Sequence, residues 1–396
     1  MTPRELLRAR AGLIQLVLAE RNLDGVLLNR VDNFAAATGG RRNYINIHSD
    51  LGANGLAITR EGKVFYIGNN IERPRLEDEE LGDIVDGFHD FLWTENTPAG
   101  CVREHFTGQW ASDDGSLGEN IHGALAMART LLTPLELDRY RALGRLAAEA
   151  MEATLAQIAP GTTEADIAAI QVCEGQRRHC QVPVSLVAAD DRIAKYRHPL
   201  PTLGPLCGDG ASQGVRRYVM VVGCFQREGL IVSLTRFKQV AELPRQITDS
   251  FARICAVDAA VQEATLPGCT LGNVFTDLQA AYERQGFREN EWHNHHQGGL
   301  TGYAGRTAKG TPGSQVPCLD ADFAARVSEL TGAPVQFGCA FAWNPSAPGV
   351  KSEDTFLLHP DGRREIISAT PSLPQVDLAA LLGHPTDIRK SGIAPA

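Results

Sequence analysis

The segment 217–237, RYVMVVGCFQREGLIVSLTRF, is the sequence feature that most constrains the fold of this chain. Two apolar runs, Val219–Phe225 and Leu230–Phe237, flank a short polar break that ends in Gly229. Runs rich in β-branched and aromatic residues around a Gly-containing break are typical of two antiparallel strands joined by a turn. The sequence therefore predicts a β-hairpin, around which the rest of the chain is organised.

Composition narrows the class of protein and its compartment. The chain has 396 residues and a net charge of -9, which argues against nucleic acid or an anionic membrane as partner. No apolar run approaches the roughly 20 residues needed to span a bilayer. The N-terminus is typical of a capped helix rather than a signal peptide, with Thr2 as N-cap and Glu5 as its partner. Nine cysteines without a C-x-x-C pair indicate free thiols, so we expect a cytoplasmic protein.

The order of predicted elements suggests a small first domain, a larger second one and a tail. We place the first domain at 1–125, the second at 126–371 and the tail at 372–396. Strands are predicted in the first domain at 26–28, 55–59 and 64–67, because apolar runs are bounded there by turn residues. The second domain has predicted helices and strands with clear starts and stops, at 131–158, 182–189, 246–264, 271–285 and 353–358.

Several of these motifs resemble one known superfamily. The hairpin ends in Thr235-Arg236, a helix starts at Thr133-Pro134-Leu135-Glu136, and a Pro-Gly-x-Thr-Glu turn occupies 160–164. Together they resemble creatinase, prolidase and aminopeptidase P, the "pita-bread" superfamily, over roughly residues 1–370. The resemblance implies an α/β (α+β) protein with a pita-bread C-terminal domain, a small creatinase-like N-terminal α/β domain, and a homodimer.

The resemblance also shows where this chain departs from the metallopeptidases. Those enzymes hold two metal ions through five ligands, and the matching residues here are Val222, Ser233, His296, Asn344 and Glu353. Three carboxylates are replaced, whereas two adjacent divalent ions need several of them. We therefore expect no metal cofactor. The alternative is a single, weakly held divalent ion on His296, Glu353 and either Asn344 or His295.

What remains of the site resembles creatinase, which works without metal. His198 matches the proton-transfer imidazole of creatinase, and a neutral-range pKa suits that role. The resemblance implies a metal-independent hydrolase, similar to creatinase or ectoine hydrolase, that cleaves a C–N bond of a small amino-acid-like amide, lactam or amidine. His198 would be the acid/base, while His296 and Glu353 would orient or polarise the scissile group.

Substrate-binding residues are expected around these three. Arg236 or Arg306 is predicted to pair with a substrate carboxylate, since a guanidinium offers a bidentate fork. Tyr303 and Trp343 are predicted to wall the pocket. Asn344 stands where creatinase has an acid for its guanidinium substrate, so creatine itself is not expected.

Two other functions stay open. A Xaa-Pro aminopeptidase- or dipeptidase-like enzyme with a degenerate metal site would need acids from elsewhere, such as Asp190, Asp191 or Glu228. A catalytically inactive pita-bread binding protein would be favoured if His198 lay outside the pocket. Cys224, beside the pocket strand, is a weaker candidate nucleophile. In relatives that dimerise, N-terminal loops such as the one at 41–48 reach the partner's active site.

Overall fold

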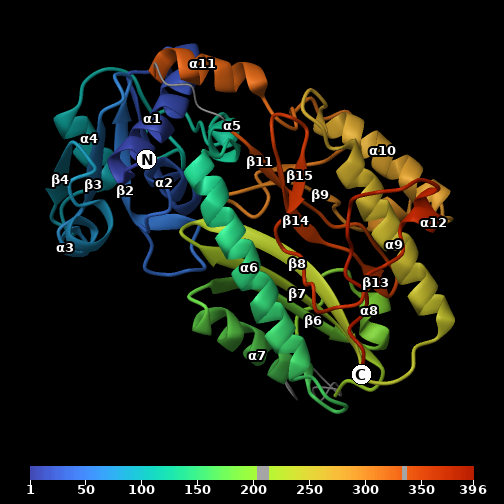
Figure 1. Cartoon of the computed structure of the whole chain (residues 1–396). Helices are drawn as coiled ribbons and strands as arrows, with labels where there is room; N and C mark the ends of the chain where they lie inside the picture. The colour runs from blue at the N-terminus through green and yellow to red at the C-terminus, as the bar shows by residue number, and fades with distance from the viewer. Residues whose placement is uncertain (203–213, 332–336) are drawn as a thin grey trace.

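The computed structural model describes residues 1–202, 214–331 and 337–396, in two lobes that lie side by side (Figure 1). The blue and teal N-terminal lobe contains one mixed sheet, and the larger second lobe contains the predicted hairpin. Among the described helices, none combines the length and apolarity needed to cross a bilayer.

The N-terminal lobe is built on a five-stranded sheet in the order β4-β3-β2-β1-β5. As predicted, Thr2 and Glu5 form a capping box at the start of the first helix. The three predicted strands are also present, slightly longer than expected. The elements of this lobe are α1 (Pro3–Glu20), β1 (Gly25–Arg30), α2 (Val31–Thr38), β2 (Leu51–Thr59), β3 (Val64–Asn69), α3 (Arg73–Arg75), β4 (Gly87–Phe91), α4 (Pro98–His105), β5 (Trp110–Ser112) and α5 (Ala126–Thr130).

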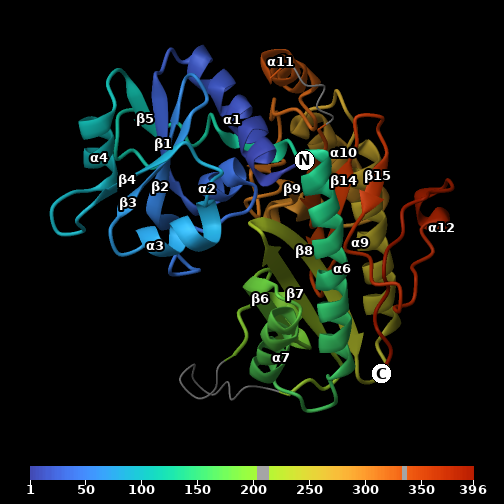
Figure 2. The same cartoon turned by 60° about the vertical axis from the view of Figure 1, so that its left-hand side comes forward.

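The predicted hairpin forms the centre of the second lobe. Strands β7 (Tyr218–Arg227) and β8 (Leu230–Gln239) pair antiparallel, and β6 (Gln181–Ala189) pairs with the free edge of β7. The turn between β7 and β8 has Gly229 at φ +74°, a conformation that favours glycine. Helix α6 (Pro134–Ala156) packs on β8, and α7 (Glu164–Arg177) packs on β6. Figures 1 and 2 show both helices along this sheet.

A second sheet, in the order β10-β9-β11-β14-β15, continues from the hairpin. The backbone N–H of Thr235 donates to the carbonyl of Glu353 at 3.1 Å, which joins β8 to the start of β14. Helices α9 and α10 cover this half of the lobe (Figure 2). The remaining elements are α8 (Asp191–Lys195), α9 (Arg245–Ala264), α10 (Leu271–Arg284), β9 (Gly298–Thr301), β10 (Ala308–Lys309), α11 (Ala321–Thr331), β11 (Cys339–Trp343), β12 (Ser346–Ala347), β13 (Val350–Lys351), β14 (Asp354–Leu358), β15 (Arg364–Ile366) and α12 (Ala379–Leu382).

The C-terminal tail packs against its own lobe. Ala394 pairs with Lys238 on β8, and Lys390 is 1% exposed. The ammonium of Lys390 binds Asp258 at 2.5 Å and Asp354 at 3.1 Å. A fully buried ammonium with two carboxylate partners ties the tail to the second sheet.

Candidate active site

One face of the hairpin presents the positions where the metallopeptidases would carry their two Asp ligands. Val222 pairs with Thr235, and Cys224 pairs with Ser233, so the four side chains share one face. The Sγ of Cys224 lies 3.2 Å from Ser233 Oγ. Burial raises the pKa of the Cys224 thiol, so it is not the activated thiolate that a nucleophile requires. Val222 belongs to the apolar core, and this face therefore offers no carboxylate.

Glu353 lies at the junction between the two sheets and is 2% exposed. The hydroxyl of Thr235 donates to Oε2 at 2.7 Å, and Arg306 Nη2 donates to Oε1 at 2.7 Å. The ammonium of Lys351 lies 3.5 Å from Oε2. Burial alone would raise the pKa of Glu353, but Lys351, Arg306 and the hydrogen bonds lower it to about 2. Glu353 is thus an ionised carboxylate between two cations.

Arg306 links two of the predicted ligand positions. Besides its bond to Glu353, its Nη1 donates to Ser233 Oγ at 3.4 Å. Asn344 approaches the same carboxylate from another side, with Nδ2 3.5 Å from Glu353 Oε1. Asn344 Oδ1 and Arg306 Nε are buried without a hydrogen-bond partner. Arg306, Ser233, Asn344 and Glu353 therefore form one buried polar group.

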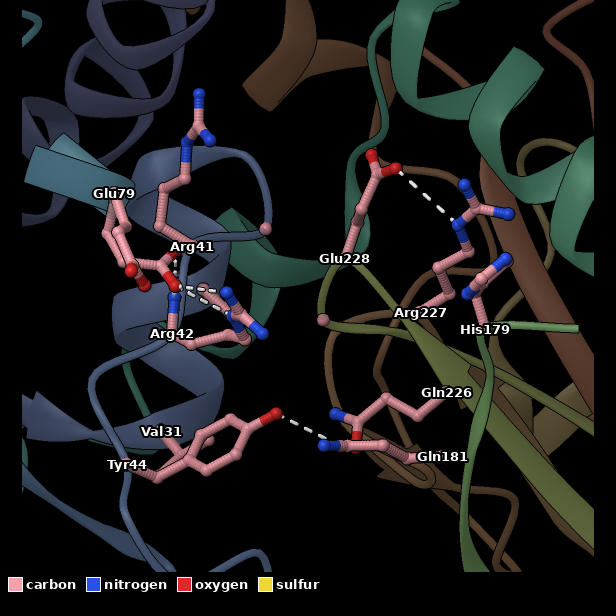
Figure 3. A pocket seen from close by; sticks show the side chains of 14 residues that line it. Val31, Arg41, Arg42, Tyr44, Glu79, His179, Gln181, Gln226, Arg227 and Glu228 are labelled. Carbon is pink, nitrogen blue, oxygen red and sulfur yellow. Dashed lines mark hydrogen bonds and ion pairs between the residues drawn. The ribbon is translucent and has the colours of Figure 1, made fainter. Parts of the chain in front are cut away.

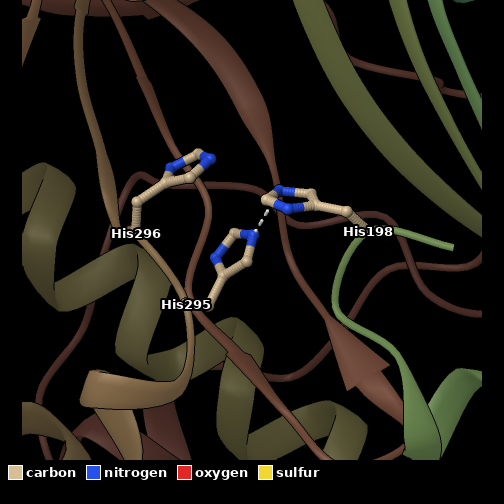
Figure 4. A group of neighbouring side chains, drawn as sticks. All are labelled: His198, His295 and His296. Carbon is tan, nitrogen blue, oxygen red and sulfur yellow. Dashed lines mark hydrogen bonds between the residues drawn. The ribbon is translucent and has the colours of Figure 1, made fainter.

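Three histidines gather together in the second lobe (Figure 4). Lys351, Glu353 and Arg306 are near enough for their charges to act on His198. His198 follows α8, whereas His295 and His296 follow a 3₁₀ turn, Glu291–Asn294. The Nε2 atoms of His198 and His295 lie 2.9 Å apart, at hydrogen-bond distance. Potential ligand atoms of all three rings lie within 4.8 Å of one another. The fold therefore brings His198 next to a histidine almost a hundred residues away.

The three imidazoles are neutral at physiological pH. Burial, followed by the charge of Lys351, lowers the pKa of both His198 and His295 below the ordinary 6.5. Burial, followed by the charge of Arg306, lowers the pKa of His296 to about 4. A neutral imidazole has one nitrogen that accepts a proton, so His198 is in the form that a general base requires.

The residues present do not fit a two-metal centre. Glu353 is the one carboxylate among the five ligand positions, and Arg306 and Lys351 already bind it. Two unit positive charges about 4 Å apart repel by roughly 4 kcal/mol at an effective dielectric constant near 20, and a divalent ion roughly doubles that. The three histidines match the ligand number of a zinc site. However, His198 and His295 bond to each other, and the charge that acts most strongly on both is the positive charge of Lys351.

Arg236 has a different role from Arg306. Its five N–H donors are all used, by Thr370 Oγ1, Asp354 Oδ1 and three backbone carbonyls, those of Thr235, Glu353 and Ser368. It is 3% exposed and braces the hairpin against β14. Arg236 therefore has no donor left for a substrate carboxylate, and Arg306 is the predicted guanidinium that reaches the site.

Tyr303 and Trp343 lie mainly in the core. The hydroxyl of Tyr303 donates to Glu136 at 2.5 Å, and the ring lies under the guanidinium of Arg10. Trp343 is fully buried, and its Nε1 donates to Thr265 Oγ1 at 3.0 Å. Tyr303 still borders a cavity, whereas Trp343 packs within the second sheet.

Two cavities lie between the lobes. The first, of about 380 Å³, is lined by Arg306 and Tyr303 from the second lobe and by residues such as Asp32 and His122 from the first. The second, of about 270 Å³, surrounds the hairpin turn (Figure 3). Both include Tyr44, whose hydroxyl donates to Gln181 Oε1 at 2.9 Å. Through Tyr44, the N-terminal loop at 41–48 thus contacts the second lobe of its own chain.

The acids that a peptidase would need are used elsewhere. Asp190 accepts backbone N–H groups of Arg216 and Arg217, and Asp191 pairs with Arg217 at 2.7 Å. Glu228 pairs with Arg139 at 3.1 Å. It also pairs with Arg227 at 3.7 Å beside the hairpin turn (Figure 3). These carboxylates stabilise loops, and the described contacts bring none of them to Glu353.

Sequence reasoning missed Lys351 as a site residue. It considered His295 only as an alternative ligand of a single divalent ion, whereas in the structure His295 is the partner of His198. Lys351 stands two residues before Glu353, and residues at that spacing in extended chain share a face. That spacing was the available signal for Lys351.

Comparison with known proteins agrees at the level of the fold. No family model matches the chain, and no curated protein sequence matches it. Among solved structures, dipeptidase PepE from Mycobacterium ulcerans aligns over 100% of both chains with a TM-score of 0.71 and 14% identity. The X-Pro aminopeptidase from Thermotoga maritima MSB8 aligns over 98% of this chain and 99% of its own, with a TM-score of 0.63 and 14% identity.

A third similar structure is named as a domain of a protein complex and not as a peptidase. The N-terminal domain of FACT complex subunit SPT16 from Cicer arietinum aligns over 96% of this chain and 99% of its own, with a TM-score of 0.59 and 9% identity. These likenesses show the fold: the chain has the predicted pita-bread fold, as this dipeptidase and this X-Pro aminopeptidase do. At such low identity the fold does not decide the reaction.

Proposed function

We propose that this protein is a metal-independent hydrolase that cleaves a C–N bond in a small amino-acid-like amide, lactam or amidine. One observation carries the proposal: His198 and His295 form a hydrogen-bonded pair, and the charge of Glu353, a carboxylate that Arg306 and Lys351 already bind, acts on His198. The histidines can transfer protons, while Val222, Ser233 and Asn344 stand at positions where a metal pair would need carboxylates.

In the proposed reaction, neutral His198 accepts a proton from water while the water oxygen bonds to the scissile carbon. The C–N bond then breaks, and protonated His198 returns that proton to the leaving nitrogen. Hydrolysis of an amide in this way consumes one water and yields a carboxylic acid and an amine. Glu353 remains ionised throughout and orients the cations around the scissile group.

Arg306 is the proposed partner of a substrate carboxylate. Its guanidinium lines the cavity of about 380 Å³ and also reaches Glu353. His296 is proposed to hydrogen-bond the substrate through Nδ1, which is buried without a partner. Arg236, Tyr303 and Trp343 act in this proposal through the packing that supports the site.

The two alternatives have some support. The similarity to a dipeptidase and an X-Pro aminopeptidase favours a peptidase, but Asp190, Asp191 and Glu228 are occupied elsewhere. The likeness to a domain of the FACT complex favours a binding protein, but His198 contacts His295 in the candidate site. We keep a cytoplasmic location and a homodimer as part of the proposal. The eight cysteines among the described residues are free, which is in line with the cytoplasm. The ninth, Cys207, lies outside the described residues.

The test is a screen of small amides, lactams and guanidino acids for release of ammonia or amine, with and without chelator. We expect turnover that chelator leaves unchanged and that His198→Ala lowers at least about a hundredfold, the usual contribution of a positioned acid/base. His384→Ala, at an exposed histidine paired with Glu263, is the matched control. Inactivation by chelator with recovery in manganese or zinc would contradict the proposal and favour the peptidase.

A further inference from the structure

Lys351 carries a buried positive charge that its surroundings compensate only in part. Its side chain is 4% exposed, and its ammonium lies 3.5 Å from Glu353 Oε2. Within the described part of the chain, that ion pair is the only polar contact of the Lys351 ammonium. An ammonium has three N–H donors, so Lys351 has donors to spare.

The charges around Lys351 do not cancel. Glu353 is the one carboxylate paired with both Lys351 and Arg306, so two positive charges share one negative charge. The neighbouring histidines are neutral and add no anion. A buried charge without a counter-ion is unfavourable, and an anionic ligand would compensate it, whereas a metal ion would increase the excess.

Other polar atoms of the site also lack partners. Nδ1 of His295, Nδ1 of His296, Oδ1 of Asn344 and Nε of Arg306 are buried without a hydrogen bond. Buried polar atoms are satisfied in the great majority of cases, so a concentration of unsatisfied ones indicates a place for a polar ligand or water. Asn344 and Arg306 both contact Glu353, and the charge of Lys351 acts on His295 and on His296.

We propose that Lys351 and Arg306 together form an anion site that binds the carboxylate of a small acidic ligand beside the three histidines. This inference deepens the proposed function, on which it rests for its catalytic meaning, because it restricts the substrate to acidic molecules and adds Lys351 to the residues that bind them. Carboxylates accept charge-assisted hydrogen bonds from both cation types. The binding itself does not require turnover.

The test is a ligand-observed NMR titration of the full chain with acetate, compared with methylammonium as a cation of similar size. We expect saturable binding of acetate and none of methylammonium. Lys351→Met should weaken acetate binding at least tenfold. Lys63→Met, at an exposed lysine between β2 and β3 in the N-terminal lobe, should leave it within twofold. Equal acetate affinity in wild type and Lys351→Met would overturn the proposal, as would no saturable binding of acetate to wild type.

Two further measurements keep the result decisive. If Lys351→Met does not fold, Lys351→Gln replaces it. The preference of the wild-type protein for acetate or for methylammonium still shows whether the site binds anions or cations. Elemental analysis after incubation with manganese, cobalt and zinc covers the opposite case, and stoichiometric metal held by the three histidines would overturn the anion site. Acetate binding without hydrolysis of any screened compound would refute the hydrolase while leaving the anion site standing.

Discussion

The guanidinium of Arg306 donates a 2.7 Å hydrogen bond to Glu353, across 47 residues of sequence. Glu353 is the one carboxylate among the five residues that match the metal ligands of the metallopeptidases. Its partner in this chain is the guanidinium of Arg306. The same carboxylate binds Thr235 and Lys351, so one ionised acid organises the site.

Replacing Glu353 by Gln should destabilise the protein. The change leaves Lys351 and Arg306 buried without their counter-ion, and breaking a buried pair in this way costs about 3–5 kcal/mol. Chemical denaturation in urea measures the loss. Glu283→Gln, at an exposed glutamate on α10, is the control and should leave the midpoint unchanged. An unchanged midpoint in Glu353→Gln would show that the carboxylate does not hold these cations.

The contribution of Glu353 to stability should depend on pH. Its folded pKa, about 2, is below the ordinary 4.5, so the unfolded chain binds the proton more readily. The stabilisation is therefore fully present above pH 4.5 and is lost as pH falls toward 2. The gap in unfolding free energy between wild type and Glu353→Gln should narrow over that interval, in urea titrations at stepped pH. A gap that stays constant would contradict the lowered pKa.

Lys351→Met should raise the pKa of His198. Burial and then the charge of Lys351 lower that pKa in the wild type, so removal of the ammonium removes part of the effect. NMR titration of the histidine ring protons measures the shift, and the acid limb of kcat/KM should move to higher pH with it. His384, a residue of the tail that pairs with Glu263 of α9, serves as an internal reference. Unchanged titration of His198 would mean that the two groups do not interact.

Arg236→Ala should destabilise the protein without changing acetate binding. All five donors of Arg236 are engaged, and its loss deprives Asp354 of one of its two cations. We expect a loss of roughly 3–5 kcal/mol, as for other broken buried pairs. Arg245→Ala, at a side chain 92% exposed, should change little. Weakened acetate binding by a folded Arg236→Ala protein would restore Arg236 as a ligand-binding residue.

Tyr303→Phe should lower stability and leave ligand binding intact. The change removes the hydroxyl that donates to buried Glu136, and an unpaired buried acceptor costs about 1–3 kcal/mol. Thermal unfolding measures the effect, with acetate titration as the second readout. A selective loss of acetate affinity at wild-type stability would return Tyr303 to the substrate pocket.

The main elements of the fold were predictable because their signals are local. The hairpin follows from two apolar runs around Gly229, and α6 begins directly after Thr133, which forms the predicted capping box with Glu136. A cap or a turn depends on residues three or four positions apart, so a single sequence contains the whole interaction. The resemblance to the superfamily also predicted His198 and Glu353 as site residues.

The partners of those residues were not predictable in the same way. Whether His295 or His296 meets His198 depends on how two loops pack, and whether Arg236 or Arg306 faces the site depends on the register of two sheets. The sequence by itself determined the hairpin, the capped helices and the absence of three metal-binding acids. Only the tertiary structure decided that Lys351 and Arg306 meet at Glu353, because contacts between distant segments arise from packing that local patterns do not encode.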